Sequence, residues 1–143
     1  MNFFYVGALL LSLLTFSAQA AEIYITDSEH TFVSFSYKHL GYSIQTSRFD
    51  RVNGIITLNN QMDEGTVDIA IETGSVSTGS DTFNKLLKSK DYFDSEKFPE
   101  LHFKSKSFRK TADGEYQLDG DMKIKDVIKP VSFKIEHSGL QKD

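Results

Sequence analysis

Apolar and polar residues alternate along most of the chain after residue 21. A period of two residues places one face of a β-strand against a core and the other face toward water. We therefore expect six or seven strands, over residues 22–26, 30–39, 49–58, 67–72, 101–106, 115–125 and 131–136, and residues 75–78 are expected to be the end of a strand. Because turn residues join consecutive stretches, an antiparallel meander is the simplest topology. The pattern does not decide whether the sheet closes into a barrel.

Two connections between these strands are predicted to be irregular. Residues 40–47 contain Gly41 and are expected to form a loop. Residues 125–130 end at Pro130, which cannot donate a backbone hydrogen bond, and are expected to turn the chain.

The run from Ser75 to Ser105 departs from the alternation. Asp81 is placed to cap a helix N-terminus, and Phe83, Leu86 and Leu87 follow at i, i+3 and i+4. The apolar stripe then continues through Tyr92, Phe93 and Phe98. In an otherwise all-β chain, this predicts one short helix and an aromatic loop that form a lid over an apolar interior.

The first twenty residues carry no charged side chain, and Phe3 to Phe16 is an apolar run. Ala18-Gln19-Ala20 has the small-x-small form that a signal peptidase cuts. We predict a signal peptide over residues 1–20 with cleavage after Ala20, and hence a periplasmic protein. A membrane anchor is the alternative, although the run is short for a bilayer span.

Composition narrows the class of protein further. The chain has no cysteine, so residues 21–143 must fold by packing alone as one domain. Its formal charge is −4 and no basic stripe is visible, which argues against nucleic acid as a partner.

Residues suited to catalysis are sparse. No G-x-S-x-G motif is present, and the four histidines lack the spacing of metal ligands. Asp119 and Asp121 lie two apart on a strand, where solvated carboxylates are the ordinary interpretation. We therefore expect no catalytic residue, no metal and no required cofactor, and a protein that is not an enzyme.

Two features allow more than one interpretation. His39 follows the inward face of its strand, either as a hydrogen-bonded core histidine or as a polar contact for a ligand at a barrel mouth. The apolar lid stripe either fills the end of the barrel or roofs a tunnel for an elongated apolar molecule. Periodicity alone does not choose between these alternatives.

Four segments together resemble the YceI-like periplasmic polyisoprenoid-binding proteins. They are residues 27–56, with Asp27, His30 and Lys38-His39, and residues 75–79, 87–105 and 116–131. Each fragment is weak alone, whereas their order and spacing over nearly all of residues 21–143 are specific. The resemblance implies an antiparallel lipocalin-like β-barrel with a lid helix, which binds an isoprenoid quinone or a related long-chain lipid for transport, storage or stress-related sequestration. Carried over by position, the ligand-lining residues would be Val33, Phe35, His39, Phe49, Phe83, Leu86, Leu87, Phe93, Phe98, Phe103, Met122 and Ile124.

Two departures from the family pattern matter. Members carry an acidic-histidine-leucine element in the lid helix, whereas residues 81–86 here read Asp-Thr-Phe-Asn-Lys-Leu and replace polar contacts with apolar ones. Members also continue beyond the position of Asp143 with strands that close the barrel. We therefore expect either a truncated chain or an open barrel, and an open edge predicts a homodimer that completes the wall.

The sequence is also compatible with two functions other than lipid binding. One is a small exported enzyme that acts on an apolar substrate, and the other is a structural module whose core is filled by its own side chains.

Overall fold

The computed structural model describes residues 21–139, and the predicted signal peptide lies outside them. The described chain is built from antiparallel strands with one α-helix, which confirms the predicted all-β class. The strands are β1 (Glu22–Ile25), β2 (Val33–His39), β3 (Ser43–Phe49), β4 (Val52–Leu58), β5 (Gly65–Glu72), β6 (Val76–Ser77), β7 (Glu100–Ala112), β8 (Glu115–Ile124) and β9 (Val127–Glu136). A 3-10 turn, η1 (Thr73–Ser75), precedes β6, and the helix is α1 (Asp81–Lys88).

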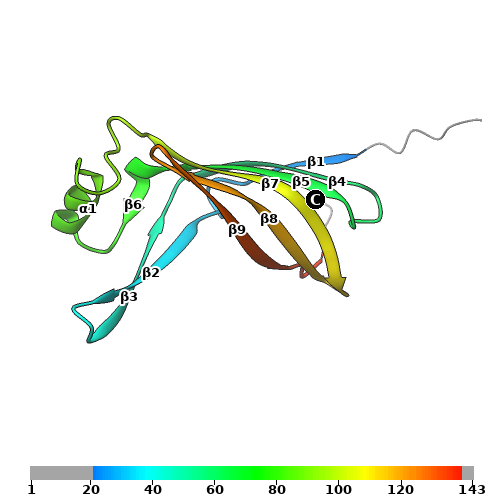
Figure 1. Ribbon diagram of the computed structural model, residues 1–143, viewed down its shortest axis with the longest axis horizontal. Helices are drawn as coiled ribbons and strands as arrows, with labels where there is room; N and C mark the ends of the chain where they lie inside the picture. The colour runs from blue at the N-terminus through cyan, green and yellow to red at the C-terminus, as the bar shows by residue number, and fades with distance from the viewer. Residues whose placement is uncertain (1–20, 140–143) are drawn as a thin grey trace, which may run out of the picture.

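The strands form two sheets rather than one simple meander (Figure 1). Six strands pair in the order β1-β4-β5-β7-β8-β9, and three pair in the order β2-β3-β6. Among the described residues, β9 pairs with β8 alone and β2 pairs with β3 alone, so the two sheets do not close into a barrel.

Alternation correctly located most strands. In β5, Val67 and Ile71 are buried, whereas the residues between them are only partly buried. In β8, Tyr116 and Leu118 are buried on the face that also carries Gly120 and Met122. These residues face the inside of the curved six-stranded sheet.

Two of the predicted connections are wrong. Most of the loop expected over residues 40–47 is strand β3, which pairs with β2 from His39–Ser43 to Val33–Phe49. Strand β3 was not recognised in the sequence because most of its side chains are exposed and polar, so they show no alternation. The turn expected over residues 125–130 is confined to residues 125 and 126, and Pro130 lies within β9. A proline is tolerated there because β9 is an edge strand.

The cap of α1 also differs from the prediction. Ser80 is the N-cap, and its Oγ accepts a hydrogen bond from the Phe83 N–H at 3.4 Å. Asp81 is instead the first residue of the helix, where its negative charge is favourable beside the helix N-terminus.

Candidate ligand-binding site

The lid and the corner between the two sheets share one buried apolar cluster. Its buried members come from β3, β4, β5, β6, α1 and β7: Phe49, Val52, Ile71, Val76, Leu87 and Leu101. Half-buried side chains from β2, α1 and the loop after it pack against them, among them Val33, Phe35, Phe83 and Phe93. The lid predicted from sequence is therefore a packed part of the fold.

Three phenylalanine rings meet under the lid. Phe35 lies 5.3 Å from Phe49, and Phe93 lies 5.2 Å from Phe49 and 6.2 Å from Phe35, measured between ring centroids. The two contacts of Phe93 are edge-on, an arrangement that is favourable for aromatic pairs at these separations. At this end of the molecule, the rings occupy the space between the sheets themselves.

Hydrogen bonds tie the lid helix to the three-stranded sheet. Asn84 Oδ1 accepts from both the N–H and the hydroxyl of Thr78, each at 2.8 Å, just after β6. The Phe93 N–H donates to the Leu87 carbonyl at 2.9 Å and folds the aromatic loop back over the helix. Leu87, 6% exposed, anchors the helix in the core.

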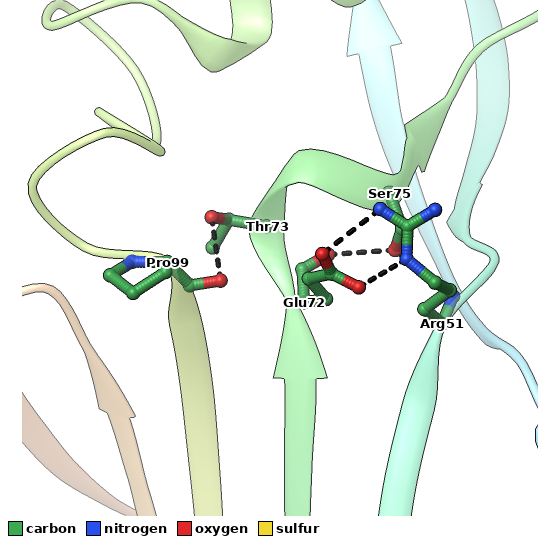
Figure 2. A network of polar contacts seen from close by, with 5 residues as sticks. All are labelled: Arg51, Glu72, Thr73, Ser75 and Pro99. Atoms are coloured by element: carbon green, nitrogen blue, oxygen red, sulfur yellow. Dashed lines mark hydrogen bonds and ion pairs between the residues drawn. The ribbon is translucent and has the colours of Figure 1, made fainter.

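A polar network fixes the corner at which the chain leaves one sheet for the other (Figure 2). Arg51 forms an ion pair with Glu72, and its backbone N–H donates to Ser75 Oγ at 3.0 Å. Ser75 Oγ donates in turn to the Glu72 carbonyl at 2.7 Å. The fully buried Thr73 donates its N–H and its hydroxyl to the Pro99 carbonyl. The hydrogen bond from Arg51 lowers the pKa of the Glu72 carboxyl, so this pair stays charged.

The inner face of the six-stranded sheet forms a second, less complete apolar cluster. Val67, Phe103 and Leu118 are buried in it. Around them lie half-buried side chains: Ile56, Ile69, Phe108, Met122, Val131 and Ile135. Phe133 packs edge-on against Phe103 at 5.2 Å and is still 41% exposed. This half of the interior is an apolar surface that the described residues cover only in part.

The twelve predicted ligand-lining residues fall into three groups. Val33, Phe35, Phe49, Phe83, Leu87 and Phe93 belong to the cluster under the lid. Phe103 and Met122 belong to the second cluster on the six-stranded sheet. The other four lie outside both clusters: His39, Leu86, Phe98 and Ile124.

The residues outside the clusters differ in their surroundings. Leu86 and Ile124 are 44% and 42% exposed, and His39 lies exposed at the end of β2. The half-buried Phe98 ring contacts the ammonium groups of Lys97 and Lys125 at 4.8 and 6.0 Å. The role of all twelve as ligand contacts stays a prediction.

The interior also contains residues that sequence reasoning did not select. Phe133 pairs with Leu118 across β8 and β9, so it faces the same interior as the second cluster. Its place in the alternation of β9 was a usable signal. Ser47 is 4% exposed on β3, opposite Phe35, and its hydroxyl has no hydrogen-bond partner among the described residues. Because residues 40–47 were expected to form a loop, no signal placed this hydroxyl inside.

A hollow of about 530 Å³ lies on the outer face of the six-stranded sheet. Its side chains come mainly from outward positions, including Asn53, Ile55, Ala70 and Lys104, and none of the twelve predicted residues lines it. It is about half open to solvent, whereas an apolar ligand is held by burying most of its surface. We therefore place the candidate site on the inner face.

The polar side chains of the outer face are engaged with one another. Asp119 accepts hydrogen bonds from Ser132, Gln117, Arg109 and Ser107, and these contacts hold the pKa of its carboxyl well below the usual range. A carboxylate held ionised in this way is unsuited to donate a proton as a general acid.

Two other kinds of feature are absent from the described part of the chain, a cluster of metal ligands and a membrane-spanning helix. No group of three His, Asp or Glu side chains within residues 21–139 is arranged to hold a metal ion. In that same part of the chain, no helix has the length and apolar character needed to cross a membrane.

Known proteins resemble the chain over most of its length. The YceI-like domain model matches residues 24–142. The chain belongs to the YceI-like family. A UPF0312 protein of Photorhabdus laumondii is 37% identical over 139 residues, which cover 96% of this chain and 71% of the relative.

Solved structures agree with this assignment. The YceI protein of Campylobacter jejuni matches with a TM-score of 0.67 and 28% identity, over 84% of this chain and 71% of that one. Burkholderia cenocepacia BcnA matches with a TM-score of 0.65 over 72% of this chain and 64% of that one, at 18% identity, which is a likeness of fold alone. The YceI-like protein described here therefore has the predicted lipocalin-like fold class, with its sheets open.

Proposed function

We propose that this YceI-like protein binds a polyisoprenoid or an isoprenoid quinone on the inner apolar face of its sheets. Its role would be transport, storage or stress-related sequestration of the lipid in the periplasm. The family resemblance supports this class of ligand, and the predicted signal peptide supports the compartment.

The observation that carries the proposal is the incompletely covered inner face of β8 and β9. Met122, Val131 and Ile135 are only half-buried there, and Phe133 is 41% exposed. Burying ~400 Å² of apolar lipid surface against such a face contributes up to about 10 kcal/mol before ordering costs. An extended hydrocarbon chain matches this surface because it needs no polar partner along its length.

The ligand's polar end has a candidate partner in His39. His39, the polar contact predicted from sequence, lies on the same face of β2 as Phe35 but is exposed. As an exposed imidazole at the end of β2, His39 can be reached from solvent and stays the candidate contact for the polar end of the ligand.

Native mass spectrometry and organic extraction of the purified protein test the proposal. We expect a co-purified isoprenoid lipid, or uptake of added ubiquinone by protein that is first stripped of lipid. Absence of both would contradict the proposal and favour a core filled by its own side chains. Turnover of an added apolar ester or epoxide would favour the enzyme alternative.

A pair of variants on β9 localises the binding. Phe133→Glu places a charge on the inner face and is expected to lower quinone affinity about tenfold or more, because a carboxylate opposes an apolar chain. Ile128→Glu is the matched control, since Ile128 is 60% exposed on the same strand and faces outward, opposite Lys123. Equal losses in both variants would contradict binding on the inner face.

A further inference from the structure

Large apolar side chains project from the tip of the β2–β3 hairpin. Leu40, Tyr42 and Ile44 are 78%, 94% and 73% exposed. Figure 1 shows the hairpin extending away from the six-stranded sheet, with its tip far from β4 and β5. We propose that this tip docks the protein onto the surface of an anionic phospholipid bilayer.

The backbone of the tip holds these side chains in place at some cost. The Tyr42 N–H donates to the His39 carbonyl at 3.0 Å and closes a turn whose central residues, Leu40 and Gly41, have φ of 49° and 79°. Positive φ at both central positions favours Asn-Gly, and a leucine there is strained. Leu40 makes no compensating burial, because 78% of it faces solvent. Contact with a surface that removes Leu40 and Tyr42 from water would explain why both apolar side chains are placed at the tip.

The charge around the tip favours an anionic surface. Residues 31–49 contain no aspartate or glutamate, although the chain carries a formal charge of −4. Lys38 pairs with Ile44 next to the tip and makes no ion pair within the described residues. Arg48, further from the tip, is already paired with Asp50 at 2.6 Å. Lys38 is therefore available to lipid phosphates, and the acidic remainder of the protein is repelled from them.

Strand β2, which leads to the tip, contacts the lid, and this contact suggests what the docking is for. The Tyr37 ring on β2 contacts the Phe83 ring of α1, with centroids 5.9 Å apart. Leu86, on the next turn of α1, is 44% exposed. A tip that rests on the bilayer would bring the lid end of the interior to the membrane, where an isoprenoid lipid must be collected or delivered. This purpose rests on the proposed function, whereas the docking itself does not.

Vesicle flotation tests the docking directly. The protein is expressed as the mature form expected after cleavage at Ala20, so that residues 1–20 cannot anchor it. Vesicles of phosphatidylethanolamine with phosphatidylglycerol are compared with vesicles of phosphatidylcholine alone. We expect binding to the anionic vesicles, weakened by salt, and a loss of about tenfold or more in the double variant Leu40→Ser, Tyr42→Ser.

The control is the double variant Ile23→Ser, Ile25→Ser. These residues are 68% and 78% exposed on β1, in the other sheet, and pair with Thr57 and Ile55. An equal loss in this control would overturn the proposal, because adhesion would then follow exposed apolar area in general.

A tryptophan at the tip reports insertion, since the chain has none of its own. In Tyr42→Trp, we expect a blue-shifted emission on addition of the anionic vesicles and quenching by brominated phospholipid. An unshifted, unquenched emission would overturn the proposal, as would tip-dependent association of the protein with itself instead of with vesicles.

Ubiquinone uptake from detergent solution, measured on the Leu40→Ser, Tyr42→Ser variant, separates the two proposals. We expect uptake to be retained while vesicle binding is lost, because the tip is not part of the inner face. If uptake is absent from the unmodified protein but vesicle binding is present, the proposed function fails and the docking stands.

Discussion

The polar residues of this protein differ in how completely their side-chain atoms are hydrogen-bonded. The Asp119 carboxylate illustrates one extreme: Ser132 and Gln117 donate to its Oδ1 at 2.6 and 3.0 Å, and Arg109 and Ser107 donate to its Oδ2 at 2.9 and 3.1 Å. The Ser47 hydroxyl illustrates the other, since it is buried without a partner in the described chain. The first arrangement stabilises strands β7, β8 and β9 at their outer face, and the second carries the cost of an unmade hydrogen bond.

The lowered pKa of Asp119 predicts a pH-dependent stability. These hydrogen bonds favour the charged carboxylate, so their contribution is complete above the ordinary carboxyl pKa and is lost as the pH falls toward the lowered one. We expect Asp119→Asn to lower Tm by a few degrees at pH 7 and the difference from the unmodified protein to shrink below about pH 4. Thermal unfolding followed by circular dichroism measures both values. Asp113→Asn, in the exposed β7–β8 turn, is the control, and a pH-independent deficit in Asp119→Asn would contradict the explanation.

Gly120 shows that the inner face also depends on the absence of a side chain. A Cβ at this position would lie 2.4 Å from the Lys104 carbonyl oxygen and 2.7 Å from the Phe103 ring. We expect Gly120→Ala to lower the free energy of unfolding by about 1–3 kcal/mol, because a backbone atom cannot move aside without disturbing the β7–β8 ladder. Urea unfolding measures the change. Gly74→Ala, where a Cβ would meet nothing within 4 Å, is expected to unfold like the unmodified protein, and equal effects at the two glycines would contradict the steric argument.

At the scale of elements, α1 is too short to be stable alone and depends on its attachments. Leu87 anchors it in the core, Ser80 caps it, and the Asn84 amide holds it to Thr78. We expect Asn84→Ala to speed hydrogen exchange of the helix amides about fivefold, which corresponds to about 1 kcal/mol for the lost hydrogen bonds. Lys85→Ala is the control on the exposed side of the same helix. Unchanged exchange in Asn84→Ala would show that packing of Leu87 alone holds the lid.

Sequence patterns predicted the elements to different extents for physical reasons. Strands with one buried and one exposed face, such as β5 and β8, can be recognised in the sequence because their apolar and polar residues alternate. Strand β3 cannot be recognised in this way, because five of its seven residues are exposed and only Ser47 and Phe49 are buried. The lid helix was visible because its stripe at i, i+3 and i+4 belongs to no strand. Its cap was misplaced by one residue because Ser80 and Asp81 are both good N-caps.

The whole molecule is shaped by contacts that alternation does not encode. The division into two sheets depends on the corner at which Arg51, Glu72, Thr73 and Ser75 join segments far apart in the chain. Each of these residues is ordinary in isolation, so the meander expected from sequence missed the break. The candidate site was likewise predicted as one set of inward-facing apolar residues. The structure divides this set between the lid end, which is filled by side chains, and the inner face of the six-stranded sheet, which is only partly covered. Only the second has the character of a binding surface.

The open edge of β9 leads to the last prediction, a homodimer that extends the six-stranded sheet. Val127 and Ile128 are 54% and 60% exposed on this strand, and a second β9 could pair with the edge that no strand within residues 21–139 covers. We expect light scattering to give twice the mass of one mature chain. The double variant Val127→Lys, Ile128→Lys is expected to give a monomer, because lysines on an edge oppose strand pairing. Ile55→Lys is the control, since Ile55 is 53% exposed but lies on β4, which already has a partner on each side. A stable, well-folded monomer at all concentrations in the unmodified protein would contradict the dimer.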